Sequence, residues 1–210
     1  MNLVVIAKEP RPGHVKTRLC PPCTPVEAAA LAEAALADTL AAALGSSARD
    51  VILALHGEPG PWLPSGVRVV PQRGRGLDER LAAAFDDAGG PSLLIGMDTP
   101  QVTSELLDTA LSSLDGPRLD AVIGAADDGG WWALGLRRPD RRAFLGVPMS
   151  AVTTHDAQRR RLVALGLRIG HLPGLRDVDT FDDARVVADE IPGSRFAARV
   201  AATTARWVRA

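Results

Sequence analysis

The sequence contains no tyrosine, only two cysteines and no excess of charge of either sign. Its 24 lysines and arginines are balanced by 25 aspartates and glutamates. A surface that binds nucleic acid or an anionic membrane usually shows as a basic excess, so this balance argues against both partners. Any site for a negatively charged ligand must therefore be built locally, from a few cations brought together.

The sequence also lacks a long hydrophobic run. Its longest apolar stretches have the length of a strand, well short of the ~20 residues that cross a bilayer. Met1 leads directly into a strand-like run, with no signal peptide before it. We therefore expect a cytoplasmic chain with no membrane partner.

The two cysteines, Cys20 and Cys23, stand in a Cys-Pro-Pro-Cys segment. This spacing is typical of thioredoxin-like redox motifs and of half a zinc site. A structural zinc ion takes four ligands, and no second paired motif supplies the missing two. The alternative, which we favour, is a pair of thiols in a loop.

Short apolar runs bounded by glycine, proline or charge alternate with helical patterns. Such runs are typical of strands buried on both faces of a parallel sheet. The predicted strands include residues 4–6, 51–55, 93–95 and 121–123, and the predicted helices are 25–44, 77–88 and 104–114. This alternation predicts an α/β fold with helices on both faces of a mostly parallel sheet. Because 210 residues that are 46% hydrophobic can bury one sizeable core and no linker interrupts them, we expect a single domain over residues 1–210.

The alternation changes after Gly124. A glycine turn precedes an apolar run at residues 131–136, and a helix over 152–165 precedes a strand over 167–172, so we expect a mixed sheet. The segment 194–208 places Phe196, Val200, Thr203 and Trp207 on one helical stripe, with Arg209 among the charges elsewhere. This stripe predicts a packing helix, and a homodimer contact is the alternative.

A basic loop directly follows the first strand and ends in Lys16-Thr17-Arg18. Lysine offers a mobile point charge, arginine a bidentate fork, and Gly13 lets the backbone approach an anion closely. The loop matches neither of the common phosphate-binding fingerprints, and basic loops are often merely solvated. Its position after a strand favours a phosphate site, to which Lys8 would add charge.

Acidic residues follow three other strands. Asp98 comes directly after a buried strand and is the favoured metal ligand, although it could instead begin the turn into the next helix. Asp177 and Asp179 point to the same side of an extended segment, and we choose Asp179 as the second ligand. Either of them could equally cap the following helix. Asp128 precedes two glycines and two tryptophans, a turn that permits close approach to a ligand.

Five motifs occur in an order that identifies a family resemblance. They are Lys8-x-Pro10-x-Pro12-Gly13-x-Val15-Lys16-Thr17-Arg18-Leu19, Gln72-x-Gly74 through Arg80-Leu81, Gly96-x-Asp98-x-Pro100, Asp128-Gly129-Gly130 and Asp177-Val178-Asp179-Thr180. On these motifs, which span nearly the whole chain, the sequence resembles the DUF2064 family. That family belongs with the nucleotide-diphospho-sugar transferases of GT-A fold. The chain is also similar, more distantly, to the phospholactate guanylyltransferases, which transfer a nucleotidyl group.

The resemblance implies a Rossmann-like GT-A fold and a role for each motif. Donor phosphates would be held by Lys16 and Arg18, and the donor pocket completed by Lys8, Gly13, Gln72 and Arg80. Asp98 and Asp179 would bind Mg²⁺ or Mn²⁺. Asp128 would face the acceptor, which makes Asp128 and Lys16 the expected catalytic residues.

Three functions share this set of residues. The first is glycosyl transfer from a nucleotide-diphospho-sugar to a small acceptor, which family grounds favour. The second is nucleotidyl transfer from a nucleoside triphosphate to a phosphorylated acceptor, which the Lys-Thr-Arg segment favours. The third is a sensor that binds nucleotide without catalysis.

Overall fold

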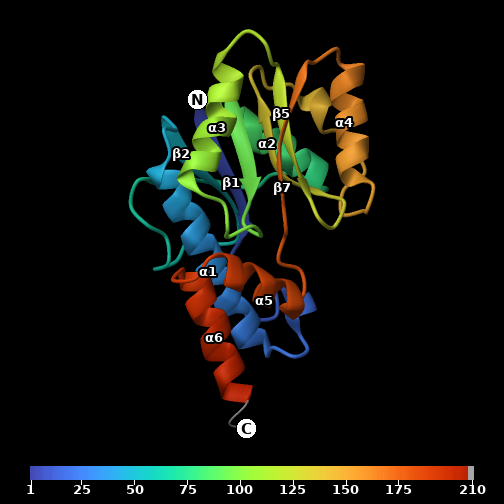
Figure 1. Cartoon of the computed structure of the whole chain (residues 1–210). Coiled ribbons are helices and arrows are strands. Elements are labelled where there is room, and N and C mark those ends of the chain that lie inside the picture. Colours follow the sequence, from blue (N-terminus) through green and yellow to red (C-terminus); the bar gives the residue numbers. More distant parts are fainter. Residues whose placement is uncertain (208–210) are drawn as a thin grey trace.

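The computed structural model describes residues 1–207, which form a seven-stranded sheet flanked by helices (Figure 1). The strands are β1 (Asn2–Lys8), β2 (Asp50–His56), β3 (Val67–Pro71), β4 (Ser92–Gly96), β5 (Ala121–Ala126), β6 (Trp131–Leu136) and β7 (Ile169–Leu175). The helices are α1 (Pro25–Gly45), α2 (Leu77–Ala88), α3 (Ser104–Asp115), α4 (Thr154–Ala164), α5 (Phe181–Glu190) and α6 (Arg195–Trp207), with short 3₁₀ helices η1 (Thr17–Leu19) and η2 (Arg141–Ala143).

The strands run in the order β3-β2-β1-β4-β6-β5-β7. Strand β6 is antiparallel to both of its neighbours, β4 and β5, and the other pairings are parallel. The predicted α/β fold with a mostly parallel, mixed sheet is therefore confirmed. With the exception of β6, the strands deliver their carboxyl ends to the same edge of the sheet.

Most element boundaries agree with the sequence prediction, and the helix caps explain why. The side chain of Thr24 accepts a hydrogen bond from the Glu27 amide and begins α1, as its position before Pro25 predicts. The helix predicted over 152–165 and the strand predicted over 167–172 are displaced: α4 begins at Thr154, and β7 begins at Ile169. The Leu167 amide bonds back to the Leu162 carbonyl, so this residue ends the helix instead of starting the strand.

Alternation along the strands divides the core into two layers. In β1, Leu3, Val5 and Ala7 pack with α1 and α3 on one face of the sheet. Val4 points to the opposite face and packs with α2, η2 and α4. Figure 1 shows α3 in front of the sheet and α2 behind it. Burial on both faces explains why the strands are continuous apolar runs.

A third apolar cluster lies beyond the sheet, where α5 and α6 pack against α1 (Figure 1). The predicted stripe of α6 is buried at Phe196, Val200 and Thr203, and the Trp207 ring lies 4.6 Å from that of Phe181. Val208 and Arg209 lie outside the described residues. The stripe thus packs within the chain, and a homodimer contact stays a prediction.

Helix α1 is apolar over a greater length than the sequence reading expected. Within the described residues it alone is long and apolar enough to cross a membrane, by length and composition, with a mean hydropathy of 1.4. Many alanines produce this value without any run of large apolar residues. Half of its most apolar window is buried inside the protein, as in a core helix, so this test is weak evidence for a membrane span.

Asp120, just before β5, links the starts or ends of three neighbouring strands. Its carboxylate accepts a hydrogen bond of 2.7 Å from Arg168, before β7, and pairs with Arg137, after β6. Hydrogen bonds from the Arg168 side chain are the main cause that holds the pKa of Asp120 well below its usual range. The ion cluster stabilises the sheet edge opposite to the strand ends described below.

Replacing Asp120 with Asn should lower the free energy of unfolding at pH 7, because two arginines lose their shared carboxylate. A depressed pKa in the folded state stabilises the fold above the unfolded pKa, about 4, and this contribution declines as the pH falls below that value. The difference between wild type and Asp120→Asn in urea denaturation should therefore shrink between pH 7 and pH 3. Asp115→Asn is the control, since the described residues give Asp115 no ion pair. A difference that stayed constant with pH would contradict the role of this ion cluster.

Candidate active site

A cleft of about 690 Å³ opens at the carboxyl edge of the sheet, beside the ends of β1, β4 and β5. Eight of the nine predicted site residues line it: Lys8, Lys16, Arg18, Gln72, Arg80, Asp98, Asp128 and Asp179. The ninth, Gly13, does not line the cleft and forms a turn with a positive φ of 78°. The structure thus gathers residues from distant parts of the sequence, while their individual roles remain predictions.

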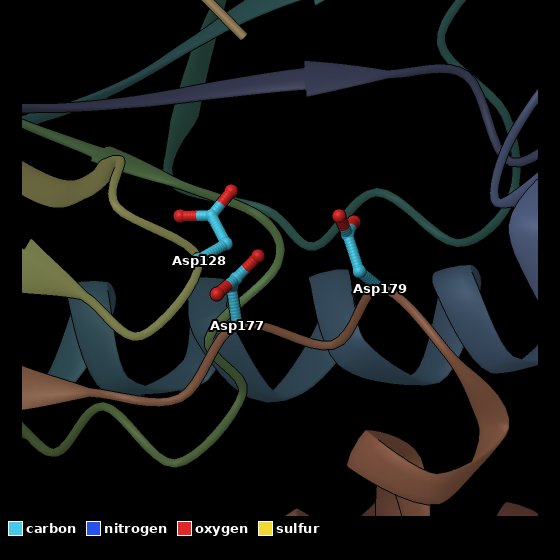
Figure 2. A group of neighbouring side chains, drawn as sticks. All are labelled: Asp128, Asp177 and Asp179. Carbon is cyan, nitrogen blue, oxygen red and sulfur yellow. The ribbon is translucent and has the colours of Figure 1, made fainter. Parts of the chain in front are cut away.

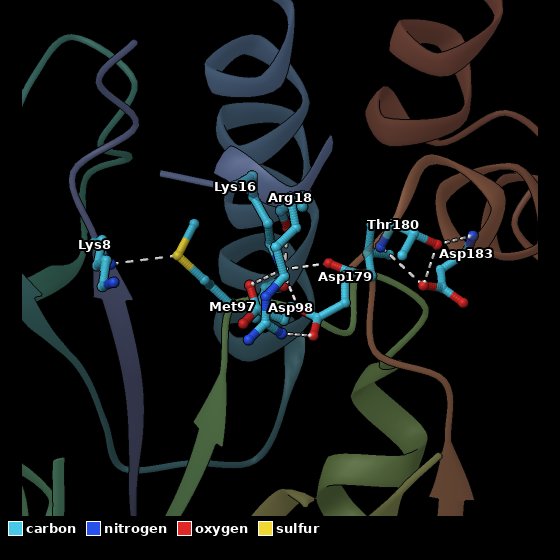
Figure 3. Close-up of polar contacts among 11 residues, drawn as sticks. Lys8, Lys16, Arg18, Met97, Asp98, Asp179, Thr180 and Asp183 are labelled. Carbon is cyan, nitrogen blue, oxygen red and sulfur yellow. Dashed lines mark hydrogen bonds and ion pairs between the residues drawn. The ribbon is translucent and has the colours of Figure 1, made fainter. Parts of the chain in front are cut away.

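The ammonium group of Lys16 lies among acceptors from two other loops (Figure 3). Its Nζ is 2.7 Å from Oδ1 of Asp98 and 3.8 Å from Oδ1 of Asp179, and it also donates to the carbonyl oxygen of Val178. The side chain of Lys16 is only 9% exposed. Burial of an ammonium requires such partners, because the lost hydration must be replaced.

Arg18 approaches one of these acids, Asp179, from the solvent side. Its guanidinium donates a hydrogen bond of 2.6 Å to Oδ2 of Asp179, and its side chain is 73% exposed. The loops that carry the acids are joined by their main chains, since the Val178 amide donates to the Asp98 carbonyl at 2.9 Å. Two cations and two acids thus form one charge cluster at the centre of the cleft.

Three carboxylates converge beside this cluster. Asp128, Asp177 and Asp179 each offer an oxygen within 4.8 Å of the others, and Figure 2 shows their side chains directed into the same space. Asp98 is not a member of this group, because its carboxylate faces Lys16. The predicted metal pair of Asp98 and Asp179 is therefore brought together around a lysine, and Asp177 joins Asp179 as the extended segment indicates.

The crowding of these acids changes the pKa of one of them. Burial, together with the negative charges of Asp128 and Asp179, raises the pKa of Asp177 to about 6, while Lys16 acts in the opposite direction. Carboxylates so close together repel one another unless a cation lies between them. An all-oxygen set of this kind suits a hard divalent cation such as Mg²⁺ or Mn²⁺, so the residues present fit the predicted metal.

The turn between β5 and β6 orients Asp128. Its Oδ1 accepts a hydrogen bond of 2.6 Å from the Gly130 amide. Gly129 has a φ of 87°, and a Cβ built on it would overlap the carbonyl oxygen of Val152. The Gly129 carbonyl also accepts a hydrogen bond from the His155 amide. The segment before α4 is thus docked directly on the glycine backbone, beside the acid.

The wall of the cleft next to Asp128 is apolar. Trp131 and Met149 line it, and Val152 lies at its rim with 81% of its surface exposed. Trp132 is buried, and its indole nitrogen donates to the Pro173 carbonyl. The two tryptophans therefore differ in burial, as alternation along an antiparallel strand predicts.

Gln72 and Arg80, which are also predicted to bind the donor, line the same cleft. The amide nitrogen of Gln72 donates to the carbonyl oxygens of Ala7 and Ala54, so this side chain bridges β1 and β2. The guanidinium of Arg80 donates a hydrogen bond of 3.2 Å to the Gly74 carbonyl.

The sequence alone did not indicate Thr99, a cleft residue whose buried hydroxyl has no hydrogen-bond partner within the described residues. Only its position beside Asp98 could have indicated it.

The chain matches a family model described as uncharacterized proteins conserved in bacteria (DUF2064) over residues 27–151. A search of the curated proteins finds no match. Among solved structures, a candidate nucleotide-diphospho-sugar transferase from Desulfovibrio desulfuricans G20 is 27% identical, with a TM-score of 0.86 over 97% of this chain and 95% of the other.

Two further solved structures show the fold alone. A nucleotidyl transferase from Methanothermobacter is 20% identical, with a TM-score of 0.61 over 90% of this chain and 97% of the other. A UDP-glucose pyrophosphorylase from Acinetobacter baumanii is 12% identical, with a TM-score of 0.58 over 93% and 96% of the two chains. The likeness to the Desulfovibrio protein confirms the predicted fold relationship to nucleotide-diphospho-sugar transferases.

Replacing Gly129 with Ala should destabilise the protein more than a positive φ alone explains. Gly193→Ala is the matched control, because Gly193 has a φ of 91° and no heavy atom within 4 Å of a built Cβ. The control should lose about 1 kcal/mol of unfolding free energy from backbone strain. Gly129→Ala should lose at least about 1 kcal/mol more, because the new methyl group overlaps a carbonyl oxygen. Urea denaturation measures both, and equal losses would contradict the close docking at Gly129.

Proposed function

This chain belongs to the DUF2064 family, and from that premise and the geometry of its cleft we propose that it is a metal-dependent transferase with a nucleotide donor. One observation carries the proposal: two cations from the loop after β1 and three carboxylates from two other loops meet in a single cleft. Open α/β sheets bind their ligands at this edge. The likeness to the Desulfovibrio protein supports the same class of reaction.

The proposed roles follow from the charge of each group. Lys16 and Arg18 bind the phosphates of the donor, since ammonium and guanidinium groups are strong donors to phosphate oxygens. Asp177 and Asp179, with Asp98 nearby, hold the divalent cation. When bound, that cation would neutralise negative charge on the donor pyrophosphate. Lys8, Gln72 and Arg80 line the remainder of the donor side.

We favour glycosyl transfer to a small acceptor. The space beside Asp128 is bounded by Trp131, whose ring offers an apolar face of the kind that packs on a sugar or an aliphatic group. Asp128 is fixed by the Gly130 amide and directed into the cleft, so it is placed to accept a proton from an acceptor hydroxyl.

Nucleotidyl transfer is the second candidate, favoured by one observation. Lys16 and Arg18 both reach the acids of the cleft from a single short loop, which concentrates positive charge where an α-phosphate would develop negative charge. This reaction would use the same donor loop and the same acids. The nucleotide that binds distinguishes the two candidates.

A thermal-shift screen with Mn²⁺ should identify the donor. A nucleotide sugar at about 100 times its dissociation constant should raise the melting temperature by about 5 °C or more. Asp179→Asn should abolish the shift, whereas Asp182→Asn, which removes an exposed charge on α5, should retain it. A shift with nucleoside triphosphates alone would favour nucleotidyl transfer. A shift without turnover of the bound nucleotide would favour a sensor. No shift with any nucleotide would contradict the proposal.

Asp128→Asn should reduce turnover by about 100-fold or more, the usual contribution of a general base. Retention of the Mn²⁺-dependent thermal shift would separate loss of the base from loss of the metal. Asp127→Asn is the matched control, since Asp127 precedes Asp128 but pairs with Arg176 at 3.2 Å. Near-normal turnover of the Asp128→Asn enzyme would exclude the general-base role.

A further inference from the structure

The ammonium group of Lys16 contacts oxygen atoms of the protein itself. An ammonium group has three protons. Two close acceptors face it, the carboxylate of Asp98 at 2.7 Å and the carbonyl oxygen of Val178, and the carboxylate of Asp179 lies at ion-pair distance, 3.8 Å. A donor phosphate that approaches Lys16 must therefore compete with oxygen atoms of the protein for the same ammonium group.

The backbone directs Lys16 towards these acids at a cost in conformational energy. Lys16 has φ 49° and ψ 39°, in the left-handed region, which non-glycine residues rarely adopt. Val15 and Leu19 on either side are buried, and the Leu19 amide bonds to the Lys16 carbonyl. The fold therefore maintains a strained residue whose side chain lies between two carboxylates.

Asp179 belongs to both charge groups of the cleft. One of its oxygens faces Lys16, the other accepts from Arg18, and the residue is also a member of the three-carboxylate group. A divalent cation held by Asp177 and Asp179 must therefore compete with Lys16 and Arg18 for Asp179. It must also tolerate the positive charge of a lysine that has little contact with water to screen it.

We propose that Lys16 is an internal counterion that lowers the affinity of the free protein for divalent cations and couples metal binding to nucleotide binding. Polyphosphate attracts Lys16 and Arg18 away from the acids, and the released carboxylates then hold the cation. Metal and nucleotide thus strengthen each other's binding, and by thermodynamic linkage each raises the affinity for the other by the same factor. This inference rests on the proposed metal site, but it concerns the residue that opposes the metal.

The test is a titration of the nucleotide-free protein with Mn²⁺, in which electron paramagnetic resonance measures how much Mn²⁺ stays free. Lys16→Met, which keeps the length of the side chain without its charge, should bind Mn²⁺ about 10-fold tighter than the wild type or more, in the range of typical coupling. Arg18→Met should show a smaller gain, because Arg18 is exposed. Arg18→Met also provides the test if Lys16→Met does not fold.

Lys8→Met is the matched control. Lys8 lines the same cleft, and the described residues give it no ion pair, so its loss should change the Mn²⁺ affinity little. Equal or weaker Mn²⁺ binding by Lys16→Met and Arg18→Met would overturn the counterion role while leaving the transferase proposal intact. An equal gain in Lys8→Met would overturn it too, because general charge would then explain the effect. No Mn²⁺ binding by any variant, even with nucleotide, would overturn both proposals.

Discussion

The main chain of Val178, in the loop after β7, is hydrogen-bonded to the loops after β1 and β4. Its amide donates to the Asp98 carbonyl after β4, and its own carbonyl accepts from Lys16 after β1. Its side chain is 2% exposed and packs in the apolar cluster that α5 and α6 form on α1. Because the chain is extended here, an inward Val178 leaves Asp177 and Asp179 facing the cleft. The position of these acids therefore depends on apolar packing well away from them.

The same cluster supports the basic loop. Leu19 and Cys23, which follow Lys16 and Arg18, are buried in it. Burial also raises the pKa of the Cys23 thiol to about 11, which makes it a poor thiolate and suits a packing role. The C-terminal helices thus hold the cationic loop and the acidic loop from one side, and fix the distance between opposite charges.

Much of this arrangement could be predicted from the sequence because it follows from local rules. Apolar runs bounded by glycine, proline or charged residues predicted the strands. Polar residues that directly follow parallel strands must lie together at one edge of the sheet. The pairing of Lys16 with Asp98 could not be predicted, since it depends on a left-handed backbone and on how side chains share space. The amide of Gln72 is a second case, because its two carbonyl partners are set by the spacing of β1 and β2.

The reversed direction of β6 has a consequence for how the cleft could diversify. A parallel strand brings only its last residues to the edge of the sheet where the cleft lies. Strand β6 begins at that edge, so the β5–β6 hairpin supplies both an acid, Asp128 in the turn, and an aromatic wall, Trp131 at the start of β6. Both residues sit on a hairpin that leaves the order of the other strands untouched. On the proposed roles, exchange of this hairpin and of the segment docked on Gly129 would alter acceptor selectivity and leave the residues proposed to bind the donor in place.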